Sequence, residues 1–150
     1  MSTINGNFIQ HPILQYPDRS PLNIAFVLKD IIKDKTVCDI GCACGDLLIE
    51  FSKFCKNVLG VERNKDHLYV ARARGLVVNE NEIPDADVYY VWANADGLED
   101  IMQKMKNKKG ILVLSEESRN PVLGGYEIEV PLLEHDENRK NFHLQIVELK

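Results

Sequence analysis

The chain has 150 residues, of which 45% are hydrophobic and 27% are charged. These values are typical of a single globular domain and exclude the disordered, collagen-like and coiled-coil classes. The formal net charge of −5 disfavours a general binder of nucleic acid or of anionic membranes, because such proteins are usually basic.

The N-terminal part of the chain predicts an arm followed by a helix. Residues 1–19 are polar and have no sustained periodicity, so we predict an arm there. Ser20 and Pro21 then provide a helix start, with serine at the N-cap and proline at the first helical position. Apolar residues follow at helical spacing, and the helix is predicted to end near residues 33–35. These apolar residues are Ile24, Val27, Leu28, Ile31 and Ile32.

The rest of the chain alternates between strand-like and helix-like segments. The predicted strands are 36–40, 57–61, 76–78, 88–92, 110–114, 126–130 and 142–148. The predicted helices are 46–55, 64–74 and one with the apolar face Leu98, Ile101, Met102 and Met105. This alternation predicts an α/β fold, in which a mostly parallel sheet has helices on both faces. The last two strands, joined by the charged loop 134–140, are predicted to form an antiparallel pair that closes the sheet.

All four cysteines lie within residues 38–55, as Cys38, Cys42, Cys44 and Cys55. A disulfide scaffold would spread its cysteines along the chain, so reduced thiols are expected. Three of these thiols are close enough in sequence for a metal site to be the alternative. Their spacing differs from the C-x2-C pairs of structural zinc sites, so we predict no metal.

The segment that carries chemistry is Asp39-Ile-Gly41-Cys-Ala-Cys-Gly45, which leaves the first strand and enters a helix. Glycine lets the backbone approach a ligand closely and adopt a positive φ, and the start of the helix presents free N–H groups. Glu62 ends the second strand, where a carboxylate accepts hydrogen bonds from the ribose hydroxyls of a nucleoside. The two features lie at neighbouring strand ends, which predicts a site for a nucleoside cofactor.

This pattern resembles the class I, Rossmann-like methyltransferases that depend on S-adenosylmethionine, in a minimal single-domain form spanning residues 1–150. Their first motif is D/E-x-G-x-G-x-G. Asp39, Gly41 and Gly45 match it, and Ala43 stands where the middle glycine is usual. Glu62 matches the acidic residue of the second motif.

The order of elements over residues 20–150 also matches that family, including a final hairpin that makes the last strand antiparallel. The resemblance implies a seven-stranded sheet, S-adenosylmethionine as the cofactor, and methyl transfer by in-line displacement. The residues expected to bind the cofactor are Asp39, Gly41, Cys42, Ala43, Gly45, Glu62, Asn79 and Asn94. Among them, Asp39 is expected to hold the α-amino group of the cofactor, and Asn79 to contact the adenine.

No catalytic residue is assigned from the sequence. The methyl carbon is already activated by the positive sulfur, so the protein mainly positions donor and acceptor, and a base is needed only for a protonated nucleophile. No histidine falls at the end of a predicted parallel strand; the four are His11, His67, His135 and His143. Asn94 is not followed by two prolines, which disfavours N-methylation of DNA bases.

Three alternatives to a methyltransferase remain open at the level of sequence. A dinucleotide-binding oxidoreductase dependent on NAD would carry G-x-G-x-x-G, and this chain has G-x-x-x-G. A protein that binds the cofactor without transferring methyl, as a regulatory subunit or partner, fits the same residues. The glycines and Glu62 could also be ordinary turn and surface residues.

The methyl acceptor is not specified by the sequence, and protein, RNA and small molecules all remain candidates. The net negative charge suits a basic protein, and the lysine-rich end of the last helix keeps RNA open. Selection of the acceptor is expected from the arm 1–19, the loops 79–87 and 115–125, a partner chain or a second copy of this chain. Without an apolar run near the roughly 18 residues of a membrane span, or a secretory signal, a cytoplasmic protein is expected.

Overall fold

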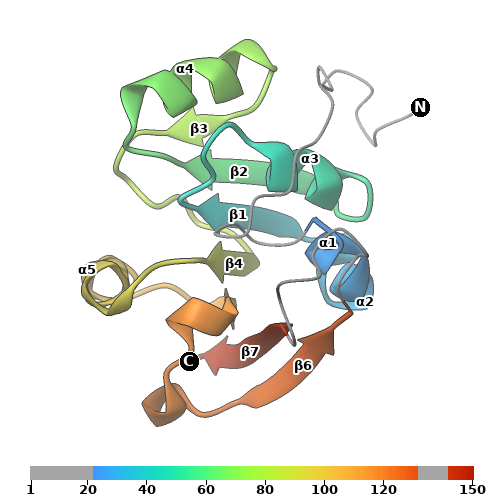
Figure 1. Ribbon diagram of the computed structural model, residues 1–150, viewed down its shortest axis with the longest axis vertical. Coiled ribbons are helices and arrows are strands. Elements are labelled where there is room, and N and C mark those ends of the chain that lie inside the picture. Colours follow the sequence, from blue (N-terminus) through green and yellow to red (C-terminus); the bar gives the residue numbers. More distant parts are fainter. Residues whose placement is uncertain (1–21, 132–141) are drawn as a thin grey trace.

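The computed structural model describes residues 22–131 and 142–150, which form one seven-stranded sheet (Figure 1). Its strands are β1 (Thr36–Ile40), β2 (Asn57–Val61), β3 (Val78–Asn79), β4 (Val88–Val91), β5 (Gly110–Leu114), β6 (Tyr126–Val130) and β7 (Phe142–Leu149). The spatial order is β3-β2-β1-β4-β5-β7-β6. Strands β1 to β5 pair in parallel, and β7 is antiparallel to both β5 and β6. The predicted mixed sheet is therefore confirmed.

The strand register brings the carboxyl ends of the parallel strands to one edge. Ile40 of β1 pairs with Val61 of β2 on one side and with Val91 of β4 on the other. Val91 in turn pairs with Leu114, the last residue of β5. The chain runs from β1 outward to β3 and then crosses to β4, so the strand order reverses between β1 and β4. Open α/β sheets bind ligands at such a switch point, outside the carboxyl ends of the strands.

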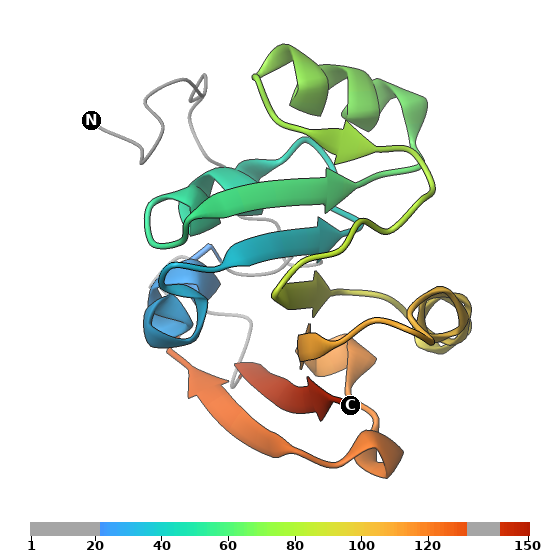
Figure 2. The same cartoon turned by 180° about the vertical axis from the view of Figure 1, so that it is seen from behind.

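Helices cover both faces of the sheet, as predicted. The helices α1 (Ile24–Val27), α2 (Lys29–Ile32), α3 (Asp46–Ser52) and α4 (Lys65–Ala73) pack into one apolar core. The helix α5 (Ala95–Lys104) packs into the other core, on the opposite face. Figures 1 and 2 show α5 standing apart from the other helices. Successive residues of a strand point to opposite faces, so Val37 belongs to the first core and Cys38 to the second.

Several boundaries differ from the sequence prediction. The single predicted N-terminal helix is divided at Leu28 into α1 and α2. Helix α3 ends at Ser52 rather than at residue 55, because Lys53 and Phe54 donate to carbonyls three residues back, which tightens the last turn. The fourth strand ends at residue 91, one residue early, and β7 extends to residue 149.

The third strand begins later than predicted because Leu76 belongs to the end of α4. Its N–H donates to the Ala71 carbonyl, and the Gly75 N–H donates to the Arg72 carbonyl. With Gly75 at φ +93°, these two bonds form a Schellman motif, a common C-terminal cap of helices. Strand β3 therefore has only two residues. The predicted helix start at Ser20, the arm 1–19 and the loop 134–140 lie outside the described residues.

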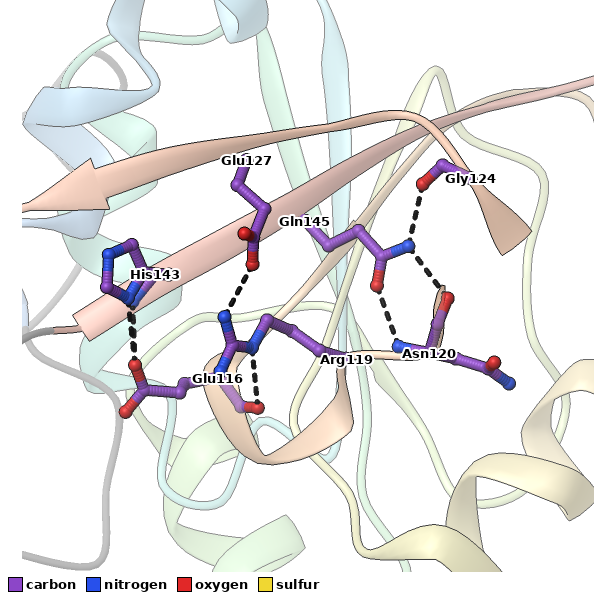
Figure 3. Close-up of polar contacts among 7 residues, drawn as sticks. All are labelled: Glu116, Arg119, Asn120, Gly124, Glu127, His143 and Gln145. Carbon is purple, nitrogen blue, oxygen red and sulfur yellow. Dashed lines mark hydrogen bonds and ion pairs between the residues drawn. The ribbon is translucent and has the colours of Figure 1, made fainter. Parts of the chain in front are cut away.

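The connection from β5 to β6 contains two short 3-10 turns, η1 (Glu116–Ser118) and η2 (Pro121–Leu123). Polar contacts fasten it to the face formed by β6 and β7 (Figure 3). The buried Gln145 amide accepts from the Asn120 N–H at 2.7 Å and donates to the carbonyls of Asn120 and Gly124 at 2.8 and 2.7 Å. The segment predicted as the loop 115–125 is thus held by specific contacts. None of the helices within the described ranges combines the length and apolar character that crossing a membrane requires.

Candidate functional site

The two glycines of the loop after β1 serve different purposes. Gly41 has φ +85° and is exposed, and a Cβ built on it would come no closer than 3.9 Å to another atom, the Trp92 carbonyl oxygen. Gly45 has φ +90° and is buried, and a Cβ there would lie 2.1 Å from Leu76 Cδ1. Gly41 therefore leaves open space at the strand edge, whereas glycine at position 45 is favoured by its left-handed backbone, with Leu76 packed close to it.

Ala43, at the position of the usual middle glycine, also adopts a left-handed backbone, with φ +51°. This conformation costs an L-residue roughly 1–2 kcal/mol. The Ala43 N–H donates to Glu62 Oε1 at 2.7 Å. The loop therefore keeps the backbone shape that glycine would adopt without strain, with a carboxylate bonded to it at the site edge.

Glu62 links the glycine loop to the end of β2. Its Oε1 accepts from Ala43 and its Oε2 accepts from the Asn64 N–H at 2.8 Å. Each oxygen of a carboxylate has about two acceptor positions. One position on each oxygen thus stays available after these bonds, and together they suit the two hydroxyls of a ribose.

Asp39 is a buried carboxylate, with 5% of its surface exposed. Burial, and then the nearby Glu62 carboxylate, raise its pKa to about 7. In the part of the chain that the structure describes, no donor forms a hydrogen bond with the Asp39 carboxylate. An ionised carboxylate in such a place is favoured by an adjacent cation, so the residues present fit a ligand that brings an ammonium group.

A cavity of about 130 Å³ opens between the ends of β1 and β2 and helix α5. It is lined by Ile40, Gly41, Val61, Glu62, Arg63, Asn81, Ile83, Ile101 and Lys104. Beside it, Arg63 and Lys104 both pair with Asp100 of α5, at 3.3 and 3.4 Å. This volume is below the range of about 300–1,000 Å³ typical of ligand sites, so a nucleoside would require these side chains to move apart.

Sequence reasoning did not identify Arg63, Asn81, Ile83 or the α5 residues as parts of this cavity. Two signals were present in the sequence. Arg63 directly follows the acidic end of β2, and Ile83 is an apolar residue in an otherwise polar loop. The contribution of α5 depends on how that helix packs against the sheet, which no local pattern reveals.

The structure gives Asn79 and Asn94 local structural contacts. Asn79 Nδ2 donates to the Glu82 carbonyl at 3.0 Å and so shapes the loop after β3. Asn94 Oδ1 accepts from the Gly97 N–H at 2.8 Å, which makes Asn94 the N-cap of α5. Asn79 is the last residue of β3, whereas Asn94 follows the end of β4 by three residues. The contacts of both residues with a cofactor stay predictions.

The thiols are placed on both sides of the sheet. Cys38 lies in the core under α5, whereas Cys42 and Cys55 lie in the opposite core. Burial raises the pKa of Cys38 to about 12 and that of Cys55 to about 11, and it also raises the pKa of Cys42. The side chain of Cys42 packs against Gly60, since a Cβ on that glycine would lie 2.7 Å from Cys42 Sγ. Cys42 thus presents backbone rather than its thiol to the loop surface.

A histidine that sequence reasoning set aside stands near the same edge. Because β7 is antiparallel, it begins where the parallel strand β5 ends. His143 Nδ1 lies 3.1 Å from Glu116 Oε1, and both side chains are partly exposed (Figure 3). The sequence placed His143 in a terminal strand, but only the strand pairing reveals its neighbour.

Comparison with known proteins shows the fold. The chain is similar to a precorrin-8w decarboxylase from Methanobacterium thermoautotrophicum, with TM-score 0.61 and 14% identity over 99% of this chain and 100% of that one. It is similar to a precorrin-6y C5,15-methyltransferase from Geobacter metallireducens, with TM-score 0.58 and 16% identity over 85% and 87% of the two chains. The S-adenosylmethionine-bound CalS10 from Micromonospora echinaspora, an amino pentose methyltransferase, gives TM-score 0.53 and 19% identity over 81% and 65%.

These structures share the Rossmann-like methyltransferase fold with this chain, at low sequence identity. The chain spans 56% of the length of DesVI from Streptomyces venezuelae, another similar structure. No protein-family model matches the chain, and no curated protein matches it by sequence.

Proposed function

From this methyltransferase fold and the carboxylates at its switch point, we propose that the chain binds S-adenosylmethionine and transfers its methyl group to an acceptor. The observation that supports this most directly is Asp39, a buried carboxylate with no hydrogen-bond donor among the described residues, next to a second carboxylate, Glu62. A ligand with positive charge would complete this arrangement.

The charge of the site favours a sulfonium cofactor over a dinucleotide. The Glu62 carboxylate adds to the cost of ionising Asp39, and the negative charge of a diphosphate would add to it further. A cationic ligand reduces it. In addition, a dinucleotide-binding motif has a third glycine at the start of the helix, next to the pyrophosphate. This chain has no glycine in that register, and Leu48 and its neighbours in α3 are buried apolar residues.

Each residue of the site has a distinct task in this proposal. Asp39 would hold the α-ammonium group, the free acceptor positions of Glu62 would receive the ribose hydroxyls, and Gly41 would let the ligand lie against the backbone. S-adenosylmethionine supplies a methyl carbon made electrophilic by its positive sulfur. The protein then needs mainly to orient the acceptor for in-line attack and to exclude competing water.

Calorimetric titration tests the binding half of the proposal. We expect the wild-type chain to bind S-adenosylmethionine and to bind NAD much more weakly. Glu62→Gln removes a charged hydrogen-bond acceptor, whose loss costs about 1–3 kcal/mol, so affinity should fall roughly 5- to 150-fold. Asp30→Asn, at an exposed carboxylate of α2, is the matched control and should bind normally. Preference for NAD, or no binding of S-adenosylmethionine, would contradict the proposal.

Transfer is tested separately from binding. The chain is incubated with S-adenosylmethionine carrying a labelled methyl group and with basic proteins, RNA and small amines or hydroxyl compounds. Label in one class of acceptor, lost in Glu62→Gln, is the expected result. Binding without label in any class would instead support a regulatory subunit that holds the cofactor.

A further inference from the structure

A buried arginine contacts the glycine loop without lining the cavity. Arg74, the C-cap residue of α4, has only 3% of its surface exposed. Its Nη1 donates to the Cys44 carbonyl at 2.9 Å and to Asp46 Oδ1 at 2.6 Å. Arginine is almost never buried to this extent unless it is paired. Here its partners are the middle of the loop and the first residue of α3.

We propose that Arg74 is a positioning residue for the cofactor loop, an inference that rests on the proposed function. Arg74 does not line the cavity at the strand ends, so it acts through the loop backbone. It donates to the Cys44 carbonyl, while Glu62 accepts from the Ala43 N–H one residue earlier in the loop. The loop is thereby held in the shape that receives the cofactor.

The loop needs such support because Ala43 is strained and the glycines on either side of it leave the backbone free to adopt other conformations. Gly41, Ala43 and Gly45 all have positive φ, at +85°, +51° and +90°. Residues in sparsely populated conformations persist only where the surrounding structure determines them from several sides. Cys44 lies between two of these residues, and its carbonyl belongs to the peptide unit that joins it to Gly45, so the Arg74 bond restrains that unit directly.

The turn at the end of α4 places Arg74 where it can donate to the Cys44 carbonyl. The Schellman turn at Gly75 reverses the chain directly after Arg74 and places Leu76 against Gly45. Arg74 thus contacts Cys44 and Asp46, and Leu76, two residues later, packs against Gly45 between them. Helix α4 and the cofactor loop behave as one unit in this proposal.

Arginine suits the task better than lysine. A guanidinium offers several N–H donors in a fixed planar fork, so one side chain serves a carbonyl and a carboxylate together. Lysine would keep the charge but hold the two acceptors less rigidly. Arg74→Lys is therefore expected to give a partial effect, and Arg74→Met a full one.

The experiment measures loop protection and cofactor affinity in the same variants. Hydrogen–deuterium exchange of peptides covering residues 41–46 is followed in the ligand-free chain, and the Kd for S-adenosylmethionine is measured by calorimetry. Arg74→Met should speed exchange in this segment and raise the Kd at least 10-fold, with Arg74→Lys between it and the wild type. A urea titration shows that each variant is folded under these conditions.

Two control variants separate positioning from general stability. Arg72→Met removes a neighbouring arginine of α4 that also donates to a carbonyl, that of Val78 at 2.8 and 3.0 Å. Ile32→Val removes a methyl group from the core at the end of α2, outside the loop 41–46, and lowers stability through lost packing. Both should leave exchange in residues 41–46 and the Kd near wild-type values.

The outcomes distinguish the two proposals. Wild-type loop exchange and wild-type Kd in both Arg74 variants would overturn the role of Arg74 while leaving the cofactor proposal intact. If the wild type itself binds no S-adenosylmethionine, the proposed function fails, and loop exchange alone decides whether Arg74 orders the loop. Should Arg74→Met not fold, Arg74→Lys and Asp46→Asn make the same comparison with smaller changes.

Discussion

At the scale of single residues, Asp39 is expected to make the stability of the folded chain depend on pH. Its pKa is raised to about 7 in the folded chain, whereas an unperturbed aspartate titrates near 3.9. Between these values the folded state binds more protons than the unfolded state, so stability falls as pH rises through this window. We expect the urea midpoint of the ligand-free chain to decrease from about pH 4 to about pH 7.

The variant Asp39→Asn provides the comparison for this pH profile. Asparagine does not titrate, so the decline in the urea midpoint between about pH 4 and pH 7 should become smaller. An equally steep decline in both proteins would assign the effect to other groups and contradict the role given to Asp39.

Ala43 gives a second prediction at this scale, because its φ of +51° is unfavourable for an L-residue. Ala43→Gly should relieve this strain and raise the free energy of unfolding by up to about 1 kcal/mol. The control is Ala73→Gly at the last residue of α4, which relieves no strain and should lower this free energy by up to about 1 kcal/mol. Urea unfolding measures the change in the free energy of unfolding for each variant. A change of the same sign in the two variants would contradict the description of Ala43 as strained.

At the scale of elements, the start of α5 separates a structural role from a predicted binding role. Asn94 caps this helix through its bond to the Gly97 N–H. Asn94→Ala should cost about 1 kcal/mol of stability, and Asn94→Asp should restore most of it. If calorimetry shows that the alanine variant still binds S-adenosylmethionine like the wild type, Asn94 is a cap and not a cofactor residue.

The connection between β5 and β6 gives another test at the scale of elements. Gln145→Leu would leave the Asn120 N–H and two carbonyls without their present partner. We expect a loss of about 1–3 kcal/mol and faster amide exchange in residues 115–125. Glu127→Gln, which alters the exposed pair with Arg119 on the same face, should have a much smaller effect, and equal effects would argue against the Gln145 contacts as the main restraint.

The elements that could be predicted from sequence are those with local signals. The strands 110–114 and 126–130, the Asn64 cap of α4 and the glycine at its end follow from apolar runs, capping residues and turn residues, and the structure confirms each. The third strand was placed too early because Leu76 is recruited into the turn after α4. The placement of Leu76 in this turn depends on its packing against Gly45, which lies about 30 residues earlier in the sequence.

Part of the candidate site could be predicted from the sequence, because it depends only on the order of the strands. Asp39, Gly41 and Glu62 come together because parallel strands end at one edge, and this follows from the strand order alone. Arg74 and Gln145 could not be predicted, since each acts on a backbone segment about 30 and 25 residues away. A single arginine or glutamine at the end of an element has no sequence signal that names such a partner.

At the scale of the whole molecule, the fold explains why the cofactor is easier to infer than the acceptor. The strand order reverses between β1 and β4, where open α/β sheets bind ligands, and the proposed cofactor residues Asp39, Gly41 and Glu62 lie near this edge. The same fold is seen in a protein described as a decarboxylase and in others described as methyltransferases. Function therefore rests on the site chemistry, above all on the paired carboxylates.

Calorimetric titration with S-adenosylmethionine near pH 6.5, in two buffers of different ionisation enthalpy, tests this most directly. An α-amino group is largely protonated there, and Asp39, with its pKa raised to about 7, is partly protonated before binding. We predict binding with net release of protons in the wild type, and weaker binding with less release in Asp39→Asn. No binding, or equal proton release in both proteins, would contradict the assignment of Asp39 as the partner of the cofactor's ammonium group.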